Sequence, residues 1–364
     1  MRGEIKGEVV YLFAFDVADE IRTAKVSEIL SEKAMSYGVR RDRMLPKTIP
    51  FYHPLTIDLK RDAWKIRGQS VQPVVRIYDV GVVSIVISVP FISHDLIELM
   101  DAHRPVLDSG HALDETARQL CSEIVDNLRP FLVRSVPAVN TPEAYTVFCL
   151  TSLDGESSAL SFVETRRREI AGLLAETESA LLSEQQIQET FRHAISFSCN
   201  DLTIIDWDAA LIIDLSSSPA DALHVLELAN LQLEELVLMD KRLDVYLEDA
   251  YWDLERKKSP LLGLPRRELA KLRRFRMDVA KITDEVSNIS KFFGDWYLAR
   301  IYLAARERFH LATWRESIHS RLGSLDNLYE VFRSESTEAR MLLLEILIVL
   351  LFVIDLAAVF YGKR

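Results

Sequence analysis

The C-terminal stretch constrains this chain most, because a long apolar segment must be buried against something. Of the 21 residues from Met341 to Tyr361, 19 are apolar. As a helix, the segment is about 31 Å long, which matches the roughly 30 Å hydrocarbon core of a bilayer. Polar residues precede it and Lys363 and Arg364 follow it, as at a membrane interface. The segment therefore predicts a single-pass transmembrane helix.

Two acidic residues, Glu345 and Asp355, lie inside this segment. Each costs up to about 3 kcal/mol near the centre of a bilayer, whereas each large apolar residue gains only about 0.3 to 0.6 kcal/mol. An acid within a membrane usually faces a partner helix, so we expect the tail helix to couple anchoring to oligomerisation. The alternative is a soluble oligomer whose tail is buried in a helical bundle.

The first 215 residues mix strand-like and helix-like patterns. Strands are expected at 9–15, 55–59, 74–89, 143–150 and three short segments between 195 and 215, and helices at 91–102, 111–128, 161–175 and 184–190. Gly81 divides the 74–89 pattern, which fits either a hairpin or a bulged strand. Because strands and helices do not alternate regularly, residues 1–215 predict an α+β domain with a mixed, largely antiparallel sheet.

After Pro219 the apolar residues keep a spacing of three and four. This spacing predicts a long helical hairpin or coiled-coil region at 220–336, with a turn near Pro260 and a seam that Asp240 interrupts. Either the helices pack on one another within the chain, or part of the seam pairs with a second copy. No Pro or Gly separates the second helix from the third between Asp295 and Leu322, so one continuous helix also fits.

The charge of the chain is unevenly distributed around a net value of −11. Residues 140–255 hold 23 acidic and 6 basic residues, whereas residues 256–276 hold 9 basic and 1 acidic. The acidic total argues against a nucleic-acid binder as a whole. The basic patch itself could contact anionic lipid, RNA or a protein partner, or pair with the acidic first helix. Its members are Arg266, Arg267, Lys271, Arg273, Arg274 and Arg276.

No motif for nucleotide binding, zinc proteolysis or serine hydrolysis occurs, so we expect neither a catalytic site nor a cofactor, and we identify no small-molecule substrate. Asp206 and Asp208 would share a strand face, which makes them weak candidates for a divalent cation or acid–base site. The favoured alternative is that they cap turns around Trp207. Three widely spaced cysteines and an N-terminus without a signal or transit peptide place the bulk of the chain in the cytoplasm.

Three segments resemble the RMD/YagE family (required for meiotic nuclear division), namely Ala229–Leu236, Phe292–Tyr297 and Leu342–Leu350. The similarity spans Val74 to the C-terminus. It implies a membrane-associated, oligomeric protein without an established catalytic site. Eukaryotic members are similar to mitochondrial inner-membrane proteins that support organellar translation. Because this chain lacks a transit peptide, the resemblance implies a bacterial plasma membrane.

Together these patterns predict a non-enzymatic, membrane-anchored scaffold that forms homo-oligomers and tethers a macromolecular partner, with the ribosome as the partner that the resemblance suggests. Two alternatives remain open. One is an enzyme or a nucleotide- or metal-responsive protein that uses the α+β domain. The other is a soluble helical oligomer with a buried tail.

Overall fold

A computed structural model describes most of the chain and divides it into two compact units. The described residues are 4–26, 37–41, 54–59, 63–135, 139–153, 155, 158–216, 218–256, 277 and 296–361. The first unit, here called the sheet unit, comprises Met1–Glu235 and Ser287–Ala312. The second, called the helical unit, comprises Leu236–Val286 and Thr313–Arg364.

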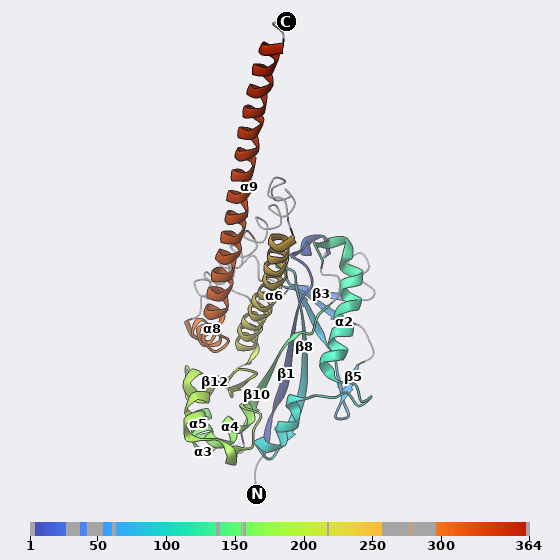
Figure 1. The fold of residues 1–364 in the computed structure, drawn as a ribbon. Coiled ribbons are helices and arrows are strands. Elements are labelled where there is room, and N and C mark those ends of the chain that lie inside the picture. Colours follow the sequence, from blue (N-terminus) through green and yellow to red (C-terminus); the bar gives the residue numbers. More distant parts are fainter. Residues whose placement is uncertain are drawn as a thin grey trace. The chain divides into compact units, whose positions relative to one another are not determined.

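Within the described residues, the sheet unit is built on one nine-stranded sheet in the order β11-β12-β13-β10-β1-β8-β7-β4-β3 (Figure 1). Its pairings are antiparallel except for β10 with β13, which is parallel. The strands are β1 (Ile5–Asp16), β3 (Tyr37–Arg41), β4 (Leu55–Leu59), β7 (Val74–Ile77), β8 (Val82–Ser93), β10 (Glu143–Ser152), β11 (Ala194–Ile195), β12 (Asp201–Ile205) and β13 (Ala209–Asp214). Two small pairs add β2 (Glu20–Ile21) with β9 (Leu132–Val133), and β5 (Trp64–Ile66) with β6 (Gln69–Val71).

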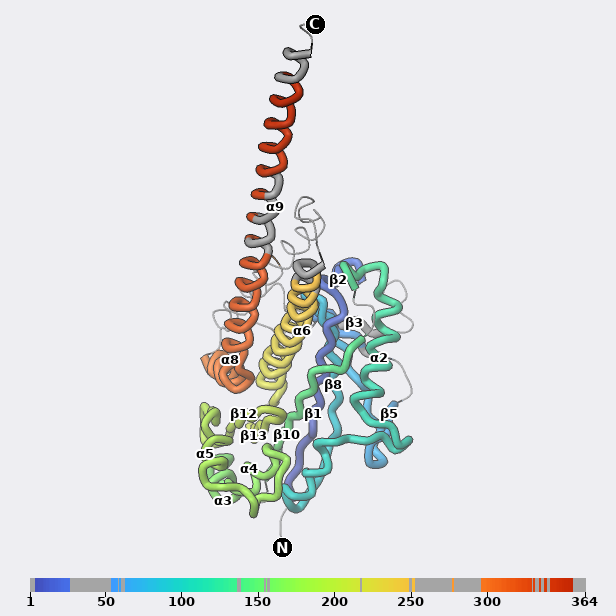
Figure 2. The backbone as a smooth tube through the Cα atoms, in the orientation of Figure 1, coloured from blue at the N-terminus to red at the C-terminus, as the bar shows by residue number. Residues whose placement is uncertain are grey.

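Helices pack on this sheet within the sheet unit, and further helical segments make up the helical unit. The helices are η1 (Leu96–His103), α2 (Leu113–Leu128), η2 (Arg129–Phe131), α3 (Ala159–Thr165), α4 (Arg167–Leu174), η3 (Ser179–Leu181), α5 (Glu184–Thr190), η4 (Phe191–His193), α6 (Ala220–Arg256), α8 (Trp296–Arg308) and α9 (Leu311–Tyr361), where η marks a 3-10 helix. The path of the chain through these elements can be followed in Figure 2.

The main core lies on one face of the sheet. Val9, Tyr11 and Phe13 of β1 point to this face because alternate residues of a strand point to the same side. They pack with buried residues of η1, α2, α3 and α4, among them Leu99 and Phe162. The residues between them face the other side and are also buried. Helices therefore cover both faces, which explains why β1 is a continuous apolar run rather than an alternating one.

The pattern at 74–89 is a hairpin, made of β7 and β8. Gly81 closes its turn with a φ of 95°, and its N–H donates to the Tyr78 carbonyl at 3.1 Å. A Cβ at this position would lie 1.8 Å from the Ala18 carbonyl oxygen, so only glycine fits.

The first turns of α6, together with α8, lie on the second face of the sheet. Asn230 donates to the backbone carbonyl of Glu143 at 3.1 Å, and Tyr302 of α8 donates to Gln232 at 2.6 Å. Tyr297 lies 3.4 Å from the Thr203 hydroxyl on β12. Several polar side chains of α6 are therefore buried in this layer, where hydrogen bonds to the sheet and to α8 offset the cost of burial.

In the helical unit, the C-terminal half of α6 is joined to α9 by ion pairs. Arg321 of α9 pairs with Asp240 and Asp244 of α6. Asp240 interrupts the apolar seam of α6 because it binds this arginine. Ile318 and Leu325 are buried on α9. The expected second arm of the hairpin, from residue 272 to residue 295, lies outside the described residues apart from residue 277.

A break separates the last two helices. α8 ends at Arg308 and α9 begins at Leu311. His310 between them has a φ of 51°, a left-handed conformation that ends a helix without proline or glycine. The alternative of one continuous helix, which the sequence left open, is therefore excluded at this point.

The predicted transmembrane helix at 341–361 was also wrong. None of the helices in the described part of the chain combines the length and apolar character that a bilayer crossing requires. Residues 341–361 instead form the end of α9, a helix of 51 residues. Glu345 and Asp355 are the physical reason, since each acid costs about as much as several apolar residues gain. The prediction of a single-pass anchor in the plasma membrane is corrected with it, whereas contact with lipid stays a prediction.

Candidate functional site

The two aspartates singled out in the sequence do not share a strand face. Asp206 and Asp208 lie on either side of Trp207, in the turn that joins β12 to β13. Asp206 is only 4% exposed, whereas Asp208 is exposed. The Asp206 carboxylate accepts a hydrogen bond from the Trp207 N–H at 2.7 Å. Asp206 therefore caps this turn, as the favoured alternative expected.

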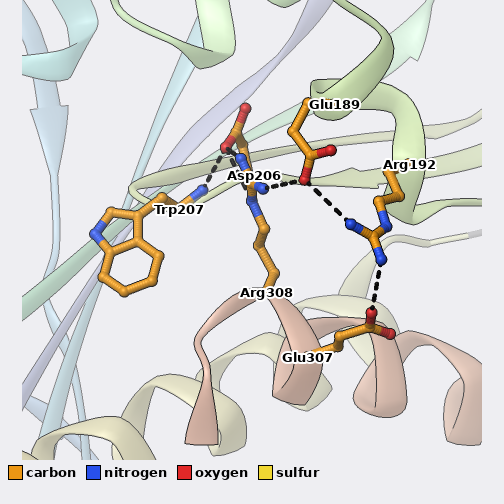
Figure 3. Close-up of polar contacts among 6 residues, drawn as sticks. All are labelled: Glu189, Arg192, Asp206, Trp207, Glu307 and Arg308. Carbon is orange, nitrogen blue, oxygen red and sulfur yellow. Dashed lines mark hydrogen bonds and ion pairs between the residues drawn. The ribbon is translucent and has the colours of Figure 1, made fainter. Parts of the chain in front are cut away.

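Arg308, from the last turn of α8, engages the Asp206 carboxylate (Figure 3). Its Nε lies 3.1 Å from Oδ1 of Asp206, and its Nη2 also donates to that oxygen. Its Nη1 donates to Glu189 of α5 at 3.3 Å. This geometry ties α8 to the β12–β13 turn and to α5.

Arg192 extends this arrangement into a chain of ion pairs (Figure 3). It lies 3.7 Å from Glu189 and 3.6 Å from Glu307 on α8. Both of these contacts are exposed, so they contribute at most about 1 kcal/mol each. We call the five residues Asp206, Glu189, Arg192, Glu307 and Arg308 the Asp206–Arg308 cluster.

Burial changes the proton affinities around this cluster. Burial, reinforced by the Asp206 charge, raises the pKa of Tyr145, whose hydroxyl donates to the Asp206 backbone carbonyl at 2.9 Å. Although the Asp208 side chain is partly exposed, desolvation of its covered part and the same Asp206 charge raise its pKa. Burial lowers the pKa of His193. The tyrosine and the histidine are thus both held in their neutral forms.

The arrangement suits a structural role better than metal binding or acid–base chemistry. The guanidinium of Arg308 occupies the position next to Asp206 that a cation would take. Among the described residues, no group of three or more His, Cys, Asp or Glu side chains is placed to hold a metal ion. Asp201 and Asp214 also cap turns, through the Ser198 N–H at 2.6 Å and the Ser216 N–H at 3.0 Å.

A second buried ion pair was missed by the sequence analysis. Glu227 of α6 is 2% exposed and pairs with Arg76 of β7. His224, one turn earlier on α6, lies 3.5 Å from the same carboxylate oxygen. Burial acts to raise the pKa of Glu227, but Arg76, His224 and Ser84 outweigh it and hold the pKa at about 2. The sequence feature that could have indicated this pair is one charged residue inside each of two strongly apolar segments, 74–77 and 225–229.

This pair makes the stability of the sheet unit dependent on pH. Because the folded state depresses the pKa of Glu227, its stabilisation is complete above the ordinary value of 4.5 and is lost as pH falls toward 2. We expect wild type to lose roughly 3 kcal/mol more than Glu227→Gln over that range. Urea unfolding of both proteins at several pH values measures the difference. If the difference in free energy of unfolding between wild type and Glu227→Gln does not narrow as the pH is lowered, the pair of Glu227 and Arg76 does not carry the charge assigned to it.

The remaining candidate residues lie elsewhere. Glu345 and Asp355 are exposed on α9. The basic patch, from Arg266 to Arg276, lies outside the described residues. The described candidates are divided between the two units, with Asp206 and Asp208 in the sheet unit and Glu345 and Asp355 in the helical unit. Within the sheet unit, Asp206 is joined to Arg308, which the sequence pattern did not single out.

The fold and its sites define a class: an α+β sheet domain, closed by buried ion pairs, that leads into long C-terminal helices. The family model described as "Uncharacterized protein MJ0711, N-terminal domain" matches residues 6–219, and the chain belongs to this family. It is 22% identical over 348 residues to "Uncharacterized protein MJ0711" of Methanocaldococcus jannaschii, which covers 93% of this chain and 97% of that protein. No solved structure matches the chain.

The resemblance to the RMD/YagE family was wrong, because the family model and the archaeal relative are both MJ0711-like. Of the segments that suggested it, Ala229–Leu236 is a buried stretch of α6, in which Asn230 bonds to the sheet and Gln232 to α8.

Proposed function

We propose that this protein is a non-enzymatic scaffold that self-associates through the C-terminal end of α9. One observation carries the proposal. Thirteen large apolar side chains between Met341 and Ile354 are each 42–71% exposed. Monomeric proteins rarely expose a contiguous apolar patch of more than about 300–600 Å². We call Met341–Ile354 the apolar segment.

The same segment of other copies is the occupant that best fits this surface. The exposed residues are consecutive in a helix, so they surround its axis rather than form a stripe. A helix that is apolar on every side needs neighbours on every side. Because one partner helix covers only one face, we expect a bundle of three or more copies. Such a bundle gives each helix an area comparable to the roughly 800 Å² per partner of a stable interface.

Glu345 inside the apolar segment and Asp355 directly after it limit the strength of this association. Residues 341–361 contain Glu345 and Asp355 but no Lys or Arg, so a bundle of these segments gathers acids without bringing cations from the segment itself. Like charges in a buried interface cost free energy. Asp355→Leu should therefore stabilise the bundle or change its size.

Sedimentation velocity of the full-length chain tests the proposal. Wild type should sediment as a trimer or larger at micromolar concentration. Leu347→Asp combined with Leu351→Asp places two acids one turn apart, and should weaken association roughly 100-fold or more. The matched control is Leu181→Asp, at an exposed leucine of η3 far along the chain, which should not change the oligomer. A monomeric wild type, an oligomer that survives the double substitution, or a chain that inserts into lipid vesicles as a monomer would overturn the proposal.

The absence of enzymatic activity is part of the proposal and rests on Asp206, the best candidate in the sequence, being engaged by Arg308. A metal or nucleotide that raises the melting temperature of wild type but not of Asp206→Asn would favour an enzyme or ligand-responsive protein instead. Binding of a macromolecular partner at the basic patch stays a prediction. The ribosome as that partner has lost its support, because it came from the resemblance to the RMD/YagE family.

A further inference from the structure

Two neighbouring cavities open on the core face of the sheet unit. The first has a volume of about 360 Å³ and lies beside the β5–β6 hairpin. Val9, Val89 and Leu99 line its apolar part, while Arg67 and Gln69 supply polar groups at its edge. A pocket of this volume is of the size that binds small molecules.

The second cavity, of about 250 Å³, is mainly apolar. Phe13 and Ala144 line it. It shares Tyr11, Arg104, Pro105 and Val106 with the first cavity. The two cavities therefore form a polar compartment and an apolar compartment with common walls.

Tyr11 is a fixed part of the wall common to both cavities. Its ring is buried, and its hydroxyl donates to the Ala102 carbonyl at 2.7 Å. Burial raises the pKa of Tyr11, and the positive charge of Arg67 works against that rise. Arg67 and Tyr11 line the same cavity.

Arg67 occupies a position that does not suit an arginine. It has a φ of 51° and is followed by Gly68 with a φ of 75°, which together make the two-residue turn between β5 and β6. Such turns favour Asn, Asp or Gly, and an ordinary L-residue is strained in this conformation. Residues held in costly conformations are often retained for function.

Arg67 is also the cation best placed to receive a ligand. Among the described residues it forms no ion pair, whereas Arg104 pairs with Glu176 at 2.9 Å. Asp101 brings one carboxylate to the same cavity, so the site is not uniformly positive. An anionic group would approach Arg67 and a neutral apolar body would extend along Tyr11 into the second cavity.

We propose that these cavities bind a small organic anion with a short apolar body, whose head group, a carboxylate or phosphate, is held by Arg67. The main-chain turn presents the guanidinium at the cavity edge, and Gln69 can donate a further hydrogen bond to the head group. The apolar compartment excludes water from the body of the ligand. This site is independent of the self-association proposed above, because it lies wholly within the sheet unit.

Isothermal titration of the full-length chain tests this site with octanoate, octyl phosphate and the neutral octan-1-ol. Wild type should bind at least one of the two anions saturably and more tightly than the alcohol. Arg67→Asn should weaken anion binding roughly tenfold or more. This variant should be at least as stable as wild type, because Asn is favoured in the turn, so lost binding cannot be ascribed to unfolding.

Two further variants separate the head group from the apolar body. Lys65→Asn removes a neighbouring exposed cation that lines neither cavity, and should leave binding unchanged. Ala144→Leu fills the apolar compartment, so it should weaken the binding of octanoate but not that of butanoate. Preference for octanoate or octyl phosphate identifies the head group. Equal anion affinities in wild type and Arg67→Asn, or no saturable binding of either anion to wild type, would overturn the proposal.

Discussion

Replacing Arg76 with methionine is expected to lower the free energy of unfolding by about 3–5 kcal/mol, the usual cost of leaving a buried charge without its partner. Glu227 would then keep its charge in a site that is 2% exposed, with His224 as the nearest remaining partner. Urea unfolding at neutral pH measures the loss. The expected loss of stability is large because the Glu227 carboxylate cannot become hydrated while the sheet and α6 remain packed.

Two variants make this test specific to the buried pair. Arg129→Met breaks an exposed pair with Asp126 on α2 and should cost less than about 1 kcal/mol. Arg76→Met combined with Glu227→Met removes both charges, and should recover most of the loss because apolar replacements of a buried pair are often tolerated. If Arg76→Met costs no more than Arg129→Met, Glu227 is not dependent on Arg76.

Arg308→Met is the second substitution with a large expected effect. It leaves Asp206 buried without its guanidinium partner and releases α8 from the β12–β13 turn, at an expected cost of about 3–5 kcal/mol. Adding Asp206→Asn should recover part of that loss, because the amide oxygen can still accept the Trp207 N–H without carrying a charge. Thermal and urea unfolding measure the stability of Arg308→Met and of the double variant.

The exposed half of the same cluster provides the control. Arg192→Met removes contacts to Glu189 and Glu307 that lie at the surface, and should change stability by less than about 1 kcal/mol. Equal losses from Arg192→Met and Arg308→Met would mean that burial of Asp206 is not what makes the cluster important.

Local patterns predicted many elements of the sheet unit well. The apolar run at 9–15 lies within β1, residues 55–59 are β4, and residues 184–190 are α5. These patterns work because the spacing of apolar residues depends on neighbours a few positions away. The pattern at 91–102 was less accurate, since β8 continues to Ser93 before the 3-10 helix η1 begins at Leu96. There, pairing with β1 extends the strand beyond its local pattern.

The candidate site was harder to predict than the fold. Asp206 was found because it stands among aspartates beside short strands, but its partner Arg308 is 102 residues away in the chain. Glu227 and Arg76 are 151 residues apart. Arg67 has no motif at all, and its position depends on a turn conformation and on cavities built by distant strands. No periodicity connects residues at such separations.

The apolar segment shows the difference between what the sequence determines and what the tertiary structure determines. By itself, the sequence determined that residues 341–354 form an apolar helix that must find cover, because consecutive apolar side chains surround a helix on every side. It did not determine what provides that cover, and the bilayer was the wrong inference. Only the tertiary structure decided which charges are neutralised, because a buried carboxylate is stabilised by whichever arginine the fold brings to it. Asp240 with Arg321, Asp206 with Arg308 and Glu227 with Arg76 are all pairs of this kind.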